Sequence, residues 1–465
     1  MLAGAEIAPA GAAPARITSA KLVAGSIAPY CEVRGYVAPQ VKFELRLPTQ
    51  NWMQRLMFSG CGGFCGTIDF RIPASDGCSA IENGEFALVT SDLGHDSRDT
   101  VWAARNPQGR IDYGHRAVHV VAVTAKAIVA RFYGRPQAYA YFNGCSDGGR
   151  EALMEVQRYP DDFNGVIAGA PVINDTANNS IFHGWSAQHL RRADGAPMFT
   201  PADLAVLHAA ALEACDSSGD GVQDGVVGDP LNCRFEPGTV TCRDGHTTGC
   251  LSGEQVQAAR ALYSGPRDPS GKALYYGRPI GSELSWNIFD ASAFAESFIR
   301  YMTTEEPQPF DLASVSYDAT ALAHYNAQAG VFNALNPDIR EFQRKGGKLI
   351  MWHGWGDAGV PPMSSIEYYR AVRRTVGAGT DAFVKLYMLP GVGHCGFGEG
   401  PDMINLVDAM IAWAEDGVPP GAVQASRRNY GRTVQTRPIY PFPMTARYTG
   451  TGDRNSATAF VGSRQ

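Results

Sequence analysis

Short apolar runs alternate with polar or glycine-rich turns over the first 171 residues. Residues 115–133 instead place apolar side chains at helical spacing, which predicts a helix. The expected strands are VKFELRL (41–47), RLMFSG (55–60), FALVTSD (86–92), AYAYF (138–142) and GVIAGAP (165–171). Short strands alternating with helices predict a mostly parallel sheet covered on both faces, the arrangement of an α/β class fold.

The alternation of expected strands and helices is lost between residues 172 and 335. This stretch holds four cysteines, many Asp and Gly residues and clusters of aromatic side chains. The alternation resumes with KLIMWHG (348–354) and VKLYMLPG (384–391). We therefore expect an α/β core formed by residues 1–171 and 336–465, with residues 172–335 inserted as a lid. A chain of 465 residues is long enough for this division.

Charge and hydropathy narrow the class of protein. There are 40 Lys and Arg against 46 Asp and Glu, a formal charge of −6, with no dense basic block. This pattern argues against nucleic acid or a membrane surface as partner. No apolar run approaches the ~18 residues that would cross a bilayer. The expected partner is a small molecule, and the oligomeric state stays open.

Ten cysteines at irregular spacing favour disulfides over zinc, because no C-x₂-C pair is present. Disulfides imply an oxidising compartment, so we expect a secreted or periplasmic protein. Residues 1–15 lack the basic start and unbroken apolar run of a signal peptide. We expect a mature chain from which the leader has been removed.

The strongest local signal is Gly144-Cys145-Ser146-Asp147-Gly148-Gly149, a G-x-S-x-G sequence between an expected strand and an expected helix. This context is typical of the nucleophile turn of an α/β-hydrolase fold. A serine hydroxyl needs a histidine to accept its proton and a carboxylate to orient that histidine. A glycine-rich structural turn is the alternative for this motif taken alone.

Two later turns supply the missing groups. Asp357 follows the strand-like KLIM and His394 follows the strand-like VKLYMLP, which gives the chain order Ser, Asp, His expected of this fold. Cys145 precedes the serine and Cys395 follows the histidine. If Ser146 and His394 meet, the two cysteines come within the separation that a disulfide requires, so we predict a Cys145–Cys395 bridge.

An oxyanion hole needs two backbone N–H donors. The N–H of Asp147, directly after the nucleophile, is one candidate. The glycine loop after an early strand, Gly60-Cys61-Gly62-Gly63, supplies the other, with Gly63 as the candidate donor. A tight turn would need the same glycines.

A second motif lies in the lid, where Asp216, Ser218, Asp220 and Asp224 occupy positions 1, 3, 5 and 9 of a loop. Hard oxygen ligands at this spacing predict a structural Ca²⁺ site, against the alternative of a solvated acidic turn. Val227 stands where an EF-hand has its bidentate Glu. Cys215 and Cys233 bracket the loop and are expected to clamp it, and Cys242 and Cys250 form a further close pair.

With these residues in hand, the chain resembles the tannase and feruloyl esterase family. The likeness is carried by YCEVRGYV, NGCSDGGREALM, HGWGD, PGVGHC and TRPIYPFPMTARYTGTGD, spread over most of the chain. It implies a lid calcium held by Asp216, Asp220, Asp224 and the carbonyl groups of Val222 and Val226, with Asp216 against Ser218 left open. It also implies an aromatic substrate wall at Trp286 and Phe294, for which core packing is the alternative.

The chain departs from the family pattern in several places. Tyr440 stands where a cysteine is expected, and Cys31 lacks its usual upstream partner. The pairing of Cys61, Cys65 and Cys78 stays open. The lid arginine with which a relative holds a terephthalate carboxylate has no match in the shortened region 284–300.

These observations predict a serine carboxylic ester hydrolase acting on esters of aromatic acids, such as hydroxycinnamic or galloyl esters. Ser146 is the nucleophile, His394 the general base and Asp357 the residue that orients the histidine. Hydrolysis of mono(2-hydroxyethyl) terephthalate is the alternative within the class. A catalytically silent, calcium-stabilised binding protein on the same scaffold is the alternative outside it, and a peptidase is less favoured.

Overall fold

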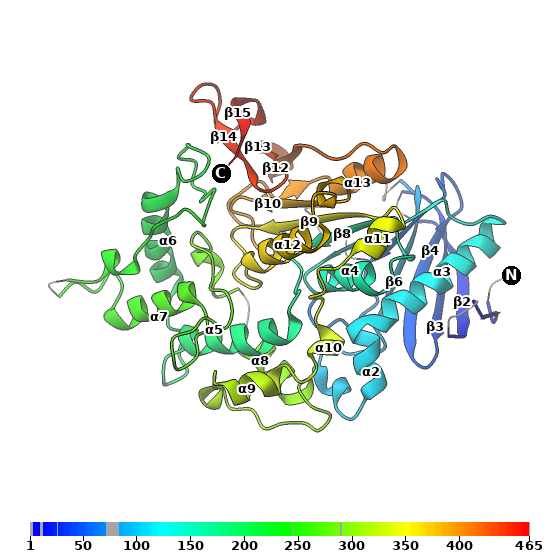
Figure 1. Ribbon diagram of the computed structural model, residues 1–465, viewed down its shortest axis with the longest axis horizontal. Coiled ribbons are helices and arrows are strands. Elements are labelled where there is room, and N and C mark those ends of the chain that lie inside the picture. Colours follow the sequence, from blue (N-terminus) through cyan, green and yellow to red (C-terminus); the bar gives the residue numbers. More distant parts are fainter. Residues whose placement is uncertain are drawn as a thin grey trace.

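A ten-stranded mixed sheet forms the centre of the protein (Figure 1). The computed structural model describes residues 3–9, 13–25, 27–70, 83–243, 245–288 and 291–464. The strand order is β1-β2-β3-β4-β6-β5-β7-β8-β9-β10. The strands are β1 (Glu6–Ile7), β2 (Ala15–Val23), β3 (Tyr30–Val37), β4 (Val41–Pro48), β5 (Arg55–Ser59), β6 (Phe86–Ser91), β7 (Tyr139–Cys145), β8 (Gly165–Gly169), β9 (Lys348–Gly354) and β10 (Val384–Leu389).

The sheet is parallel only from β6 to β10, where each neighbouring pair runs in the same direction. Strands β1 to β4 form an antiparallel meander that pairs with β6 through β4. The expectation of a mostly parallel sheet therefore holds for the half that carries the site. It missed the meander, whose strands are joined by short turns that leave no room for crossover helices.

Helices cover both faces of the parallel half, as expected from its apolar strands. Val166 and Ala168 of β8 pack into one core cluster together with Leu153 of α4 (Asp147–Arg158). Ile167, between them, points into a second cluster with Met410 of α13 (Leu406–Glu415). The remaining helices of the core are α2 (Pro107–Ile111), α3 (Ala117–Tyr133), α11 (Arg340–Arg344) and α12 (Met363–Val376).

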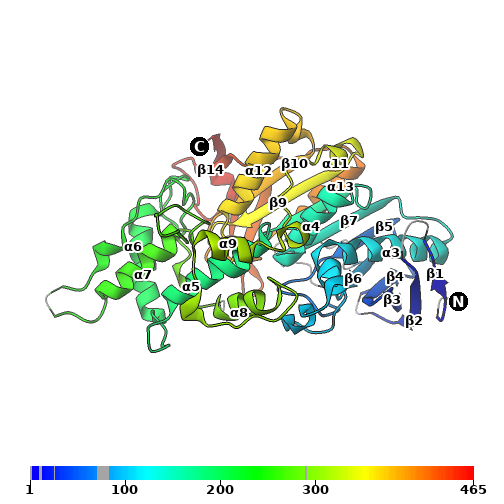
Figure 2. The same cartoon turned by 60° about the horizontal axis from the view of Figure 1, so that its bottom comes forward.

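The chain leaves the sheet after β8 and returns at β9, and the intervening residues form a helical layer beyond one end of the sheet (Figures 1 and 2). Residues 172–335, which make up most of this layer, are called the lid below. Its helices are η4 (Ala177–Phe182), α5 (His183–Leu190), α6 (Pro201–Cys215), α7 (Gly253–Ser264), α8 (Ala291–Tyr301), α9 (Ala319–Tyr325) and α10 (Ala329–Phe332). It has its own apolar clusters, centred on Trp286 and on Phe182.

The last strands form two small sheets beside the end of the lid (Figure 1). Strands β11 (Met403–Ile404), β12 (Val423–Asn429) and β13 (Arg432–Ile439) make one, and β14 (Met444–Tyr448) pairs with β15 (Phe460–Arg464) in the other. Tyr448 N–H donates to the carbonyl of Asp220, so the C-terminal segment contacts the acidic loop of the lid.

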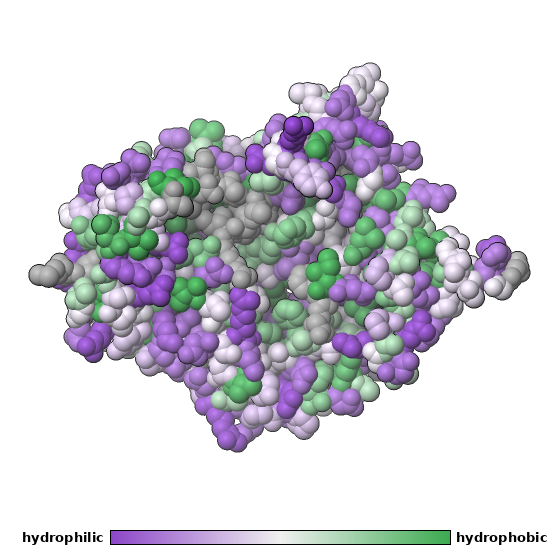
Figure 3. Space-filling view, turned by 180° about the vertical axis from the view of Figure 1, so that it is seen from behind, coloured by the Kyte–Doolittle hydropathy of each residue, from purple (hydrophilic) through white to green (hydrophobic). Residues whose placement is uncertain are grey.

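On the face seen in Figure 3, strongly hydrophobic residues occur in small groups separated by polar ones. Among the described residues, none of the helices combines the length and the apolar character needed to cross a membrane.

Candidate active site

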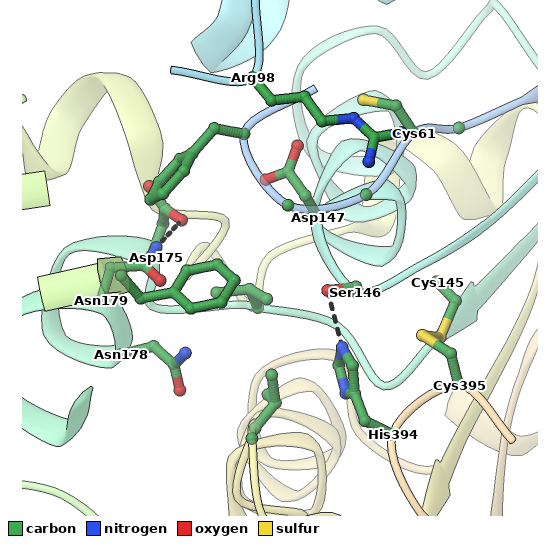
Figure 4. Close-up of a pocket in the computed structure, with 18 of the residues that line it drawn as sticks. Cys61, Arg98, Cys145, Ser146, Asp147, Asp175, Asn178, Asn179, His394 and Cys395 are labelled. Carbon is green, nitrogen blue, oxygen red and sulfur yellow. Dashed lines mark hydrogen bonds between the residues drawn. A yellow bond between two sulfur atoms is a disulfide. The ribbon is translucent and has the colours of Figure 1, made fainter. Parts of the chain in front are cut away.

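A cavity of about 730 Å³ lies between the carboxyl ends of the parallel strands and the lid. Ligands of open α/β sheets bind at this end of the strands. Ser146 and His394 line the cavity together with the loop Gly60–Phe64, and Phe294 of the lid lines it as well. Figure 4 shows the side chains around Ser146.

Ser146 occupies the sharp turn between β7 and α4, with a positive φ of 67°. Small neighbours are required here because a Cβ on Gly144 would lie 2.5 Å from the carbonyl oxygen of Gly148. A Cβ on Gly148 would lie 2.7 Å from the carbonyl oxygen of Cys61. The glycines of the motif therefore permit close backbone packing around a strained serine.

The structure brings the three expected triad residues into one hydrogen-bonded chain. His394 Nε2 lies 2.8 Å from Ser146 Oγ, and His394 Nδ1 lies 2.7 Å from Asp357 Oδ2. Because Asp357 accepts from Nδ1, the imidazole proton resides there and Nε2 is left to accept the proton of the serine. The arrangement suits nucleophilic catalysis by Ser146.

Asp357 is fully buried, and its other oxygen accepts the N–H groups of Gly359 and Val360 at 2.8 Å. Burial alone would raise the pKa of Asp357, but His394 and His353 outweigh it and hold that pKa well below its usual range. Asp357 therefore stays ionised at any working pH. His353 is a second histidine on the same carboxylate and was not expected from the sequence.

All three expected disulfides are present. Cys145–Cys395 has a Cα separation of 5.9 Å and lies beside the triad (Figure 4), and Cys215–Cys233 and Cys242–Cys250 lie in the lid. Cys61 pairs with Cys65, a connectivity that the sequence had left open. Among the cysteines that the structure describes, Cys31 has no disulfide partner, and Cys78 lies outside the described residues.

The two expected oxyanion donors flank the cavity. The N–H of Asp147 is the first of α4, and a helix has no internal acceptor for the N–H groups of its first turn. Gly63 has a positive φ of 65°, and nothing lies within 4 Å of where its Cβ would stand. Gly148 N–H donates to the carbonyl of Cys61, which ties the glycine loop to α4. The donor role of Gly63 stays a prediction.

The prediction that Trp286 belongs to the cavity wall is wrong. It is fully buried in the apolar cluster of the lid, where it packs edge-on against Phe199 and Tyr263 and donates from its ring nitrogen to Ser282. The core-packing alternative holds for this residue. Phe294 does line the cavity, as expected.

Several polar residues of the cavity were not found from the sequence. Asp175, Asn178, Asn179 and His183 line it from the start of the lid, and Arg98 lines it from the loop after β6 (Figure 4). These polar residues belong to no motif, and nothing in the sequence of their segments indicates a binding site. Only the folded arrangement places them near Ser146.

The acidic loop of the lid fits a calcium ion in part. Oδ1 of Asp224 is buried and has no hydrogen-bond partner among the described residues, and burial raises the pKa of both Asp224 and Asp220. Such carboxylates call for a cation. Arg437 of β13 meets part of this demand, with Nη1 3.2 Å from Asp220 and Nη2 in contact with Asp224.

Asp216 behaves differently from the other two aspartates. Its carboxylate accepts the N–H groups of Asp224, Gly225 and Val226, and thereby fixes the turn that the lid loop makes. The three carboxylates are not all gathered within 4.8 Å of one another in the described structure. Ligation by Asp216, Val222 and Val226 stays a prediction.

Comparison with known proteins agrees with this geometry. The family model described as tannase and feruloyl esterase matches residues 23–462. The chain is 30% identical to the mono(2-hydroxyethyl) terephthalate hydrolase of Piscinibacter sakaiensis, covering 97% of this chain and 86% of that one. It is 31% identical to a probable feruloyl esterase of Arthroderma benhamiae, covering 90% and 81%.

Solved structures show the same fold. Feruloyl esterase B from Aspergillus oryzae superposes with a TM-score of 0.86 at 27% identity over 97% of both chains. Tannin acyl hydrolase from Aspergillus niger superposes with a TM-score of 0.78 at 21% identity, over 97% of this chain and 90% of that one. The chain belongs to the tannase and feruloyl esterase family and is a carboxylic ester hydrolase.

Proposed function

We propose that the protein hydrolyses esters of aromatic acids through an acyl-enzyme formed on Ser146. The observation that carries the proposal is the chain of hydrogen bonds from Ser146 through His394 to Asp357 at the edge of a cavity lined by phenylalanines. The family and its feruloyl esterase and terephthalate monoester hydrolase relatives support the aromatic acyl group.

The reaction follows from the positions of the groups. Ser146 Oγ attacks the ester carbonyl while His394 Nε2 takes its proton, and Asp357 stabilises the imidazolium that forms. The N–H groups of Asp147 and the glycine loop would stabilise the negative oxygen, an effect worth about 3 kcal/mol per donor in such sites. His394 then protonates the leaving alcohol, and water releases the acid by the same steps.

A terephthalate monoester is the second candidate substrate. It is supported by the relative from Piscinibacter sakaiensis and by Arg98, a cationic side chain lining the cavity. Arg98 comes from the core, whereas the arginine expected from the family resemblance belongs to the lid.

Calcium binding is proposed for the acidic loop of the lid, with Asp220 and Asp224 as carboxylate ligands. The unpartnered Asp224 oxygen supports it. Bound calcium would stiffen the lid and take no part in the bond cleavage. Secretion is also proposed, and the four disulfides support it, because disulfides persist in oxidising compartments.

The test is hydrolysis of methyl ferulate, methyl gallate, mono(2-hydroxyethyl) terephthalate and p-nitrophenyl acetate by the wild type and by Ser146→Ala. We expect the wild type to cleave at least one aromatic ester, and Ser146→Ala to lose about 10⁴-fold or more in kcat. Labelling of the wild type by a fluorophosphonate, absent in Ser146→Ala, separates an esterase from a silent binding protein. A wild type that neither hydrolyses any ester nor reacts with the probe would refute the proposal.

A further inference from the structure

A second cavity, of about 350 Å³, lies beside the catalytic histidine. Its walls come mainly from the lid segment 281–288 and from the loop 391–399 that carries His394. His394 and Phe397 line this second cavity and also the larger cavity that contains Ser146, called the main cavity below. A group bound in the second cavity therefore lies next to the histidine that transfers the proton.

Large apolar side chains line the second cavity from both of its walls. Leu284 and Ile288 of the lid segment are 43% and 70% exposed, and Phe397 of the histidine loop is 77% exposed. Single exposed apolar side chains are ordinary, but three gathered around one cavity mark a binding surface. The second cavity therefore offers apolar contact area to a ligand.

The polar side chains of the second cavity leave little for a ligand to pair with. Ser282 Oγ donates to the carbonyl of Pro279 at 2.6 Å and accepts the ring N–H of Trp286 at 3.0 Å. Ser285 Oγ donates to the carbonyl of Ser282 at 2.8 Å. Glu399 adds an acidic group, which opposes an anion. These contacts favour an uncharged ligand that is largely apolar.

The backbone holds Phe397 in a conformation that residues with a side chain normally avoid. Its φ is 63°, in the left-handed region, where glycine would be unstrained. Its N–H donates to Asp402 Oδ2 at 3.0 Å, and its carbonyl accepts the N–H of Gly393 at 3.1 Å. Residues held in such conformations cluster at functional sites. An exposed phenylalanine in this position, in the same loop as His394, indicates that its ring has a use at the site.

The course of the reaction assigns the ligand. Ser146, the candidate oxyanion donors and the rings of Phe64 and Phe294 all line the main cavity, so the carbonyl group and the acyl part belong there. When the acyl-enzyme forms, the bond between the carbonyl carbon and the ester oxygen breaks, and His394 Nε2 gives its proton to that oxygen. The alcohol part therefore lies against His394 as it departs, and the second cavity adjoins the same residue.

We propose that the second cavity is the subsite for the alcohol part of the ester, that it favours an apolar alcohol, and that Phe397 is the residue that selects for it. The inference rests on the proposed function and extends it from the acyl part to the leaving group. A larger apolar alcohol covers more of Leu284, Ile288 and Phe397 than methanol does, and so lowers the barrier to acylation. A polyhydroxylated alcohol of the same length finds few groups to pair with.

The experiment compares kcat/KM for four esters of one aromatic acid, the acid whose ester the wild type cleaves best. The alcohols are methanol, 1-butanol, benzyl alcohol and glycerol. All four esters give the same acyl-enzyme, so their ratios to the methyl ester report on the alcohol part alone. We expect the wild type to favour the butyl and benzyl esters by about 10-fold or more, and the glyceryl ester by less than about threefold.

Phe397→Gly removes the ring and suits the positive φ of this position. We expect it to bring the butyl and benzyl ratios within about threefold of one, and Phe397→Leu to retain part of the preference. Tyr430→Gly is the matched control, because Tyr430 is also an exposed aromatic residue with a positive φ, of 47°, and it lines neither cavity. This control should keep the wild-type ratios.

Ile288→Ser gives the same readout from the lid side if Phe397→Gly does not fold, and fluorophosphonate labelling checks that Ser146 is intact. Wild-type ratios near one, a preference for the glyceryl ester, or ratios unchanged in every folded variant of Phe397 and Ile288 would overturn the proposal. Failure of the proposed function is distinguishable, because the wild type would then neither cleave any of the four esters nor react with the fluorophosphonate.

Discussion

His353 and His394 contact the same oxygen of Asp357. His353 Nε2 lies 3.1 Å from Asp357 Oδ2 and 2.9 Å from the carbonyl of Val360. Both neighbours are acceptors, so Nε2 carries a proton, and Nδ1 lies 2.8 Å from the hydroxyl oxygen of Ser365. His353 is therefore a second donor that helps to fix the carboxylate to which His394 is bonded.

Replacing His353 should misplace Asp357 without touching the substrate. We expect His353→Leu to lower kcat by about 10- to 100-fold with little change in KM, because small displacements of a catalytic group cost about this much. His353→Gln keeps an N–H donor and should recover part of the loss. The measurement is steady-state kinetics with p-nitrophenyl acetate, with His246→Gln as the control on an exposed lid loop. Equal losses in the Leu and Gln variants would argue against the hydrogen bond.

The Cys145–Cys395 disulfide should matter more for stability than the disulfides of the lid. It links residues 250 apart, whereas Cys242–Cys250 spans 8. Chain-entropy arithmetic gives about 5.5 kcal/mol for the long loop and about 2.5 kcal/mol for the short one. We expect the Cys145→Ser/Cys395→Ser variant to lose stability and most activity, because Ser146 and His394 are adjacent to the bridge.

Urea unfolding and ester hydrolysis test this expectation, and Cys242→Ser/Cys250→Ser is the control that should retain activity. If both double variants lose stability and activity equally, the bridge has no special role in holding serine and histidine together.

The triad could be predicted from the sequence because each of its residues lies in the turn that follows a strand. Apolar runs mark the strands, and the fold then brings their carboxyl ends together. The cysteines beside Ser146 and His394 added a distance constraint. His353 was overlooked because, within HGWGD, nothing distinguishes a histidine that binds the triad acid from one that packs in the core.

The lid was less predictable for a physical reason. Aromatic side chains there serve either the cavity or the lid's own core, and composition does not separate the two uses. Phe294 faces the cavity, whereas Trp286 fills the core. The polar residues that line the cavity from the lid lie in η4, in α5 and in the turn before η4, and only the folded arrangement shows that they come near Ser146. The antiparallel meander was missed because short turns join its strands, and only residues 41–47 were recognised as one of them.

Calcium should stabilise the protein through the acidic loop of the lid. We expect millimolar Ca²⁺ to raise the Tm of metal-depleted protein by several degrees and a chelator to reverse this, because a ligand that binds only the folded state adds to its stability. Asp224→Asn should abolish the response, since Asp224 has the unpartnered oxygen. Asp194→Asn, on an exposed turn of the lid, is the matched control. An unchanged Tm in the wild type would show that Arg437 alone balances Asp220 and Asp224.

Glu151 should make stability depend on pH between about 4.5 and 8, and should make activity fall above pH 8. It is 3% exposed, and its Oε1 accepts the N–H of Cys61 in the glycine loop at 3.2 Å. Burial, with the negative charge of Asp147, raises the pKa of Glu151 to about 8, although Arg150 lowers it. The folded protein therefore keeps a proton that the unfolded chain releases above the ordinary carboxyl pKa. The free energy of unfolding consequently falls as pH rises from about 4.5 to about 8, by at most about 1.4 kcal/mol per pH unit from this group.

Glu151→Gln retains the acceptor but cannot ionise. We expect its Tm to decline less than that of the wild type between pH 5 and pH 8. We also expect kcat/KM of the wild type to fall above pH 8, where a charged Glu151 beneath the glycine loop would oppose the negative oxygen of the transition state. In Glu151→Gln this alkaline fall should disappear, while Glu341→Gln, at a half-buried glutamate of α11 paired with Arg344, should behave like the wild type. Identical pH profiles in the wild type and Glu151→Gln would show that another group titrates in this range.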